Sequence, residues 1–104
     1  MTSPEYDEIK RRITAGIPFK AKYHGGAGAP EYHILPGLIG TTSVSGNDEE
    51  RFLGYKYVGV KGHGWRCFKV SHFRIGEITN SNVSVPSIDP VDEDMQNCIV
   101  DIDP

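Results

Sequence analysis

The stretch RFLGYKYVGV, residues 51–60, predicts a β-strand, because aromatic and β-branched residues are concentrated in it. Upstream of it, FKAKYH at residues 19–24 alternates apolar and basic side chains, so that Phe19, Ala21 and Tyr23 share one face. Glycines and prolines divide the remaining chain into short segments. We expect further strands at residues 31–35, 38–44, 65–73 and 74–79, with turns at 25–30 and 61–64 and a polar hairpin loop at 46–50.

The fold class that follows is mainly β. Several short strands separated by glycine turns are typical of a curled antiparallel sheet. Closing such a sheet into a barrel removes the exposed edges that invite aggregation. We therefore predict a small antiparallel barrel of about five strands.

A short amphipathic helix is predicted before the first strand, at residues 3–15. Ser3 suits the cap and Pro4 the first helical position. Tyr6, Ile9 and Ile13 form one apolar stripe, and Gly16 ends the helix. The stripe is narrow, which suggests a helix that lies across an open end of the barrel.

Charge divides the chain into two parts. Residues 1–79 carry all 11 basic residues and 8 acidic ones, a net charge of +3, and form the single predicted domain. Residues 80–104 carry no basic residue and six acidic ones, a net charge of −6. We predict that this acidic tail is extended or partly disordered. Cys98, Ile99, Val100 and Ile102 leave open the alternative that its end docks as an edge strand.

The two cysteines, Cys67 and Cys98, lie in segments of very different character, and we predict that both thiols are free. The N-terminal sequence MTSPEYDEIKRR lacks the apolar region of a signal peptide. No run approaches the roughly 18 apolar residues of a membrane span, so we expect no membrane association. These observations predict a cytoplasmic protein.

Catalytic motifs are absent from the sequence. The four histidines lack the spacing of a structural zinc site, so we expect no metal. The chain has neither a G-x-S-x-G elbow nor a P-loop, and we expect no cofactor. Cys67, with Arg66 and Lys69 near it, is the least implausible nucleophile, although a mid-strand thiol is usually a packing residue. We therefore predict that the protein is not an enzyme.

Basic and aromatic residues interleave on the predicted strands, and this pattern is the strongest functional signal. Rings stack on bases while ammonium and guanidinium groups bind phosphates. Such a surface favours a nucleotide or a single-stranded nucleic acid as the ligand. The predicted ligand-binding residues, expected to converge on one surface, are Lys20, Lys22, Tyr55, Tyr57, Trp65, Arg66, Lys69 and His72.

Residues 18–78 resemble the WYL domain, a small SH3-like barrel. The resemblance rests on FKAKYHGG at 19–26, ILPGL at 34–38, RFL at 51–53 and RCFKVSHF at 66–73. Arg51 stands in place of the family's tryptophan. The resemblance implies a regulator, often linked to phage or bacterial defence, that binds nucleotides or nucleic acids. It places ligand contacts at Arg66, Lys69 and His72, with Tyr55 as a stacking residue.

Under an alternative hypothesis, the chain is a small protein–protein interaction or inhibitor protein, of a kind that a phage can encode. Its acidic tail would engage a basic surface of the partner. An exposed barrel edge would also allow a homodimer. The sequence leaves these alternatives open.

Overall fold

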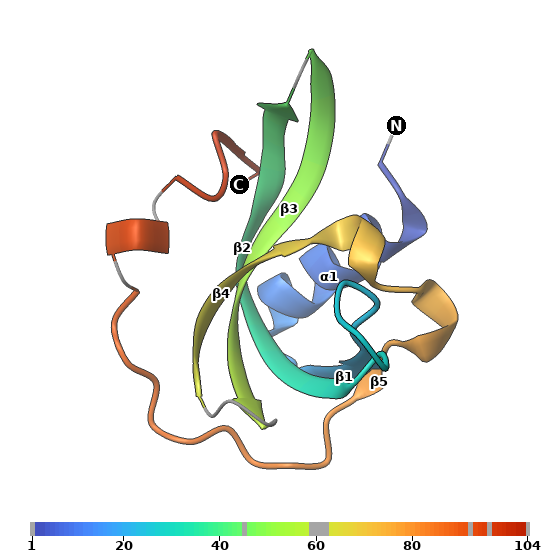
Figure 1. Ribbon diagram of the computed structural model, residues 1–104. Helices are drawn as coiled ribbons and strands as arrows, with labels where there is room; N and C mark the ends of the chain where they lie inside the picture. Colours follow the sequence, from blue (N-terminus) through green and yellow to red (C-terminus); the bar gives the residue numbers. More distant parts are fainter. Residues whose placement is uncertain (1, 45, 59–62, 92, 96, 104) are drawn as a thin grey trace.

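The centre of the structure is a long antiparallel hairpin of two strands, β2 (Glu31–Val44) and β3 (Asn47–Val58) (Figure 1). This computed structural model describes residues 2–44, 46–58, 63–91, 93–95 and 97–103. The other elements within these ranges are helix α1 (Pro4–Ala15), strands β1 (Phe19–Lys22), β4 (Gly64–Lys69), β5 (Thr79–Asn80) and β6 (Asp101–Ile102), and the 3-10 helices η1 (Val70–His72), η2 (Ile75–Glu77) and η3 (Glu93–Met95). The predicted mainly β fold with an N-terminal helix is confirmed.

The strands form one antiparallel sheet in the order β4-β3-β2-β1-β5, and β6 pairs with β2. The predicted closed barrel is wrong, because β4 and β5 lie at opposite ends of this sheet in the described part of the chain. Helix α1 packs against β2, η1 and η2. The open side of the curled sheet is therefore covered by helices instead of by strand pairing (Figure 1).

The predicted break at Pro36 and Gly37 is a bend within one strand. The pairing of β2 with β3 shifts register between Pro36 and Leu38, so residues 31–44 continue through it. Proline has no amide proton to give to the sheet, which is why it occurs at such irregular positions. The bend separates the part of β2 that pairs with β1 from the part that pairs with β6.

Three predicted segments differ from the structure. The strand predicted at 74–79 is instead a 3-10 helix, η2, over Ile75–Glu77, and only Thr79 lies in a strand, β5. The polar loop predicted at 46–50 is strand from residue 47 onward, because its carboxylates find partners: Glu49 pairs with Arg51, and Glu50 accepts a hydrogen bond from Ser3. The strand predicted through 73 ends at Lys69. The chain then turns as η1, which buries both Val70 and Phe73, whereas an extended strand would point them to opposite faces. The predicted turn at 61–64 and the end of the predicted strand 51–60 lie partly outside the described residues.

Helix α1 begins and ends as its sequence predicts. The Ser3 hydroxyl oxygen accepts a hydrogen bond from the Tyr6 amide, and Pro4 occupies the first turn. Gly16 ends the helix with a left-handed backbone, φ 70°, which only glycine adopts at no steric cost. Tyr6 and Ile9 are buried against the sheet. In the described part of the chain no helix is long and apolar enough to cross a membrane.

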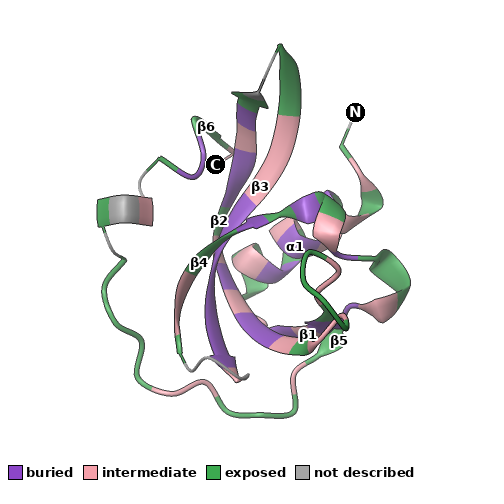
Figure 2. Ribbon diagram, viewed as in Figure 1, coloured by how far each residue is buried: buried purple, intermediate pink, exposed green. Residues whose placement is uncertain are grey.

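The hydrophobic core lies between α1 and one face of the sheet, which we call the inner face (Figure 2). Phe19, Ile34, Phe52 and Phe68 define it, one from each of β1 to β4, and all four are buried. The outer face carries the residues of opposite parity, namely Leu53, Tyr55, Tyr57 and Trp65. Each strand therefore presents two distinct surfaces.

The described residues between 81 and 103 lie on the outer side of the sheet, and contacts near both ends of this segment attach it to the sheet (Figure 1). The Ser81 hydroxyl lies 2.7 Å from both His33 Nδ1 and the Tyr57 hydroxyl. Further along, the Trp65 indole donates a hydrogen bond to the Asp89 carbonyl, and β6 pairs with β2. The edge-strand alternative for the chain end is thus the one observed.

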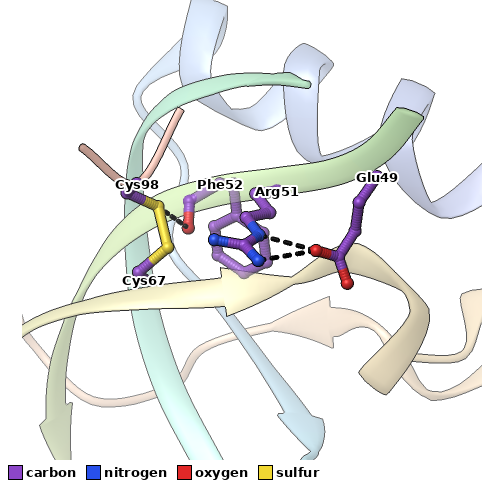
Figure 3. Close-up of a disulfide and its surroundings, with 5 residues drawn as sticks. All are labelled: Glu49, Arg51, Phe52, Cys67 and Cys98. Atoms are coloured by element: carbon purple, nitrogen blue, oxygen red, sulfur yellow. Dashed lines mark hydrogen bonds and ion pairs between the residues drawn. A yellow bond between two sulfur atoms is a disulfide. The ribbon is translucent and has the colours of Figure 1, made fainter. Parts of the chain in front are cut away.

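A disulfide joins Cys67 on β4 to Cys98 near the chain end (Figure 3). The prediction of two free thiols is therefore wrong, and the prediction of a cytoplasmic location loses one of its premises. The Cα atoms lie 5.6 Å apart, within the usual range for a disulfide. Sequence alone did not indicate the pairing, because the cysteines meet only when the tail folds back across the sheet.

Candidate ligand site

A cavity of about 190 Å³ opens on the inner face of the sheet, at the end away from the hairpin tip. Four of the residues that line it are Tyr23, Tyr32, Lys56 and Arg66, and Cys67 and Phe68 complete the lining. They come from the end of β1 and from β2, β3 and β4. The cavity therefore draws on every strand of the main part of the sheet.

Strand alternation brings the two basic residues to this cavity. Arg66 has the parity of core residue Phe68 on β4, and Lys56 has the parity of Phe52 on β3. Lys56 lies opposite Gly64 across the two strands. A Cβ on Gly64 would lie 3.1 Å from Arg66 Nη1, so the guanidinium folds back over this glycine. The Arg66 guanidinium is therefore directed toward Gly64, the residue that pairs with Lys56.

Lys56 is unusually buried for a lysine, with 4% of its surface exposed. Its ammonium lies 4.5 Å from the centroid of the Tyr32 ring, which attracts the charge through the ring's quadrupole. Tyr23 stacks on Tyr32 at a centroid distance of 5.0 Å. The tyrosine pair thus supports the lysine in a place where water is largely excluded.

No carboxylate is among the described residues that line this cavity. Arg66 is exposed, and its Nη1 donates one hydrogen bond to the Trp65 carbonyl, so other guanidinium donors remain. The site contains two cations and is partly shielded from water. The attraction between these cations and an anion is stronger there, because the local dielectric constant is lower than that of water. Chemically, the arrangement can hold a negatively charged group.

The predicted ligand-binding residues do not converge on one surface. Arg66 faces the inner side of β4, whereas Trp65 and Lys69 have the opposite parity. Lys20 and Lys22 likewise alternate with the buried inner-face residues Phe19 and Ala21. The predicted single surface is therefore divided between the two faces of the sheet.

Tyr55 and Tyr57, the predicted stacking residues, are 1% and 2% exposed. The tail lies over this part of the outer face, where the Tyr57 hydroxyl is 3.1 Å from the Val83 carbonyl oxygen. Trp65 packs edge-on against Tyr55 and is half-buried. As the chain is folded here, neither tyrosine offers a ring face to an external base.

Lys69 and His72 also have partners inside the fold. Lys69 lies 3.2 Å from Glu49, whose pKa is held below its usual range by hydrogen bonds from Arg51 and then Lys69. The His72 ring packs edge-on against Tyr23 at 5.4 Å. His72 Nδ1 is buried and lacks a hydrogen-bond partner among the described residues. His72 therefore supports the wall of the cavity from behind Tyr23.

Sequence reasoning missed Lys56, Tyr23 and Tyr32 as site residues. The sequence predicts that Tyr23 shares a face with Phe19 and Ala21, and in the structure it packs against the core on that face. The signal that points to Lys56 is its parity with Phe52 in the strongest predicted strand, since a lysine at a core-facing position needs a reason.

Within the described residues, no three His, Cys, Asp or Glu side chains gather as they would around a metal ion. Comparison of the chain with family models, with curated proteins and with solved structures finds no match. The resemblance to WYL domains stays a prediction, and functional inference rests on the geometry of the sites.

Proposed function

We propose that this protein is a non-catalytic module that binds the phosphate group of a nucleotide or of a single-stranded nucleic acid. The observation that carries the proposal is the exposed Arg66 at a cavity whose described lining also includes Tyr23, Tyr32 and Lys56. Phosphate oxygens are the natural partners of guanidinium and ammonium donors.

The size of the cavity limits what can enter it. At about 190 Å³ it is smaller than the roughly 300–1,000 Å³ of pockets for drug-sized ligands. The phosphate-bearing end of a nucleotide fits this description, with the base left outside. We therefore expect little discrimination among bases, because base-specific recognition requires contacts to base edges.

The same ligand class is implied by the resemblance to WYL domains, and Arg66 is the residue that both arguments share. Lys56 and the tyrosines come from the geometry alone. Trp65 and Lys69 do not contribute to the proposed phosphate site, and neither do the outer-face residues Lys20 and Lys22. A stacking role for Tyr55 or Tyr57 would need the tail to move away.

Calorimetric titration with inorganic phosphate, mononucleotides and a single-stranded oligonucleotide tests the proposal. We expect R66Q to weaken binding of mononucleotide roughly 10- to 150-fold, which is the loss of about 1.5–3 kcal/mol for a charge-assisted hydrogen bond. K56M should act in the same direction. Its thermal unfolding must be measured alongside, because it changes a buried residue.

The matched control is R74Q, which removes another exposed cation that does not line the cavity. If R74Q weakens binding as much as R66Q, the attraction comes from overall charge and the proposal fails. The logarithm of affinity for the oligonucleotide should fall with the logarithm of salt concentration with a slope of about −0.7 per phosphate held. If inorganic phosphate binds as tightly as the nucleotides do, the function is limited to anion binding.

A further inference from the structure

A second cavity, of about 340 Å³, lies on the outer face between the sheet and the tail. Leu38 and Leu53 form its floor, and Val91, Met95 and Ile102 come from the tail. It is unrelated to the phosphate site, which lies on the inner face. Its lining is apolar throughout these residues.

This second cavity is a surface groove and not an internal void. Leu38 is 43% exposed, Val91 is 41% exposed and Ile102 is 52% exposed. Nearby Val100 is exposed as well. Large apolar side chains that gather on a surface in this way mark an interaction site more often than isolated ones do.

A disulfide and a strand pairing attach the tail side of the groove to the sheet. Cys98 borders it, and its disulfide to Cys67 ties the tail to β4 (Figure 3). Antiparallel pairing of β6 with β2 fixes the tail a second time, at Gly40 and Thr41. These attachments restrict the tail before binding, so less conformational entropy is lost when a partner docks.

Acidic residues flank the apolar lining. Asp89 and Glu93 lie two residues before and after Val91, and Asp101 precedes Ile102. All three are exposed and form no ion pair with the described residues. The segment 80–104 contains six acidic residues and no basic one. Exposed carboxylates without a described ion pair therefore neighbour, in sequence, the apolar residues that the tail contributes to the groove.

We propose that this groove docks an amphipathic segment of a partner protein, with apolar side chains in the groove and basic side chains against the acidic rim. Helices that lie in apolar grooves through side chains at i, i+3, i+4 and i+7 are a recurrent mode of recognition. Acidic rims increase the association rate with basic partners.

A second copy of the chain fits this groove less well. Two acidic rims brought together would repel each other. The basic residues of α1 are engaged within their own chain, since Lys10 pairs with Asp103 and both Arg11 and Arg12 pair with Glu8. A basic amphipathic partner satisfies both the shape and the charge.

Fluorescence anisotropy with synthetic helical peptides of about 14 residues, four helical turns, tests this inference. The probe carries leucine at i, i+3, i+4 and i+7 and lysine elsewhere. A peptide of the same composition in scrambled order and a glutamate-for-lysine version are the comparisons. We expect the basic amphipathic peptide to bind at least tenfold more tightly than either, and binding should weaken as salt rises.

Two matched variants localise the binding. L38E puts a charge into the groove, and I75E puts one at an equally exposed apolar position outside it, since Ile75 is 44% exposed. We expect L38E to lower the peptide affinity at least tenfold and I75E to leave it within twofold. Absence of binding, equal binding of the scrambled peptide, or equal effects of the two variants would overturn the inference. Dimers that dissociate with L38E would overturn it in favour of a second copy.

Discussion

Asp103 links the end of the chain to helix α1 through its side chain and to strand β2 through its backbone amide. Its carboxylate accepts hydrogen bonds from the Tyr6 hydroxyl and the Lys10 ammonium, each at 2.7 Å. Its backbone amide donates to the Ile39 carbonyl on β2 at 2.8 Å. The end of the chain is thereby fixed to both α1 and the sheet. The hydrogen bonds from Lys10 and then Tyr6 hold the pKa of Asp103 below its usual range.

D103N is expected to lose stability in a pH-dependent way. Because the folded pKa is lower than the unfolded value of about 3.9, the carboxylate stabilises the fold above about pH 4. This contribution disappears as the pH falls through the folded pKa. Urea denaturation should therefore show wild type more stable than D103N near pH 7, with the difference shrinking below about pH 4. A difference that stays constant across this range would contradict the assignment.

At the scale of elements, Gly40 allows β6 to approach β2. A Cβ at this position would lie 2.0 Å from the Asp101 carbonyl oxygen and 2.5 Å from Ile99 Cγ2. The first contact is with backbone, which cannot rotate away as a flexible side chain can. The close approach of the two strands therefore depends on the absence of a side chain at Gly40.

G40A should displace β6 and leave the remaining sheet intact. Because the methyl group would overlap the backbone of Asp101, we expect faster amide hydrogen exchange at Asp103, whose amide bonds to Ile39. Exchange on β3 and β4 should change little. The matched control is G76A, where a Cβ meets nothing within 4 Å. If both variants leave exchange at Asp103 unchanged, the strand tolerates a side chain there.

Helices and strands could be predicted from the sequence where residues close together in the chain determine them. The cap, stripe and C-terminal glycine of α1 are all local, and so is the alternation of β1. The strand at residues 47–50 could not be predicted in this way, because its carboxylates have partners that are distant in sequence. Glu49 pairs with Lys69 on β4, and Glu50 accepts a hydrogen bond from Ser3, the cap residue of α1. The strand prediction for residues 70–73 is wrong for a similar reason, since the burial of Phe73 against four other aromatic rings overrides strand propensity.

At the scale of the molecule, the disulfide determines what the tail does. Cys67 and Cys98 are 31 residues apart in sequence, and η1, η2, β5 and η3 lie within the loop they close. A crosslink of this span stabilises a protein by restricting its unfolded chain, by roughly 3–4 kcal/mol in the entropy model. The acidic tail thus belongs to the folded unit.

The double variant C67A/C98A should be less stable than the oxidised wild type by up to roughly 3–4 kcal/mol in urea denaturation. Reductant should lower the stability of the wild type toward that of the variant and leave the variant unchanged. Thiol titration of the denatured, unreduced wild type should find no free cysteine, since both are disulfide-bonded in the structure. Stability of the wild type that does not respond to reductant would contradict the role of the crosslink.

The candidate site was predictable in residue type but not in location. Arg66 was identified because basic residues beside aromatic ones favour an anionic ligand, and it does line the cavity. The single surface failed because strand parity separates Arg66 from Trp65 and Lys69, and because the tail covers Tyr55 and Tyr57. Parity can be derived from sequence once register is known, but the docking of a tail across a sheet cannot.

The covalent loop between Cys67 and Cys98 has a consequence for proteolysis. Residues 82–84 and 87–91 are exposed and lie outside any helix or strand, which is where proteases cut folded proteins most readily. A single cut there would fall between the two bridged cysteines. The two fragments would remain one covalent molecule, and the C-terminal piece would stay on β2 until the bridge was reduced.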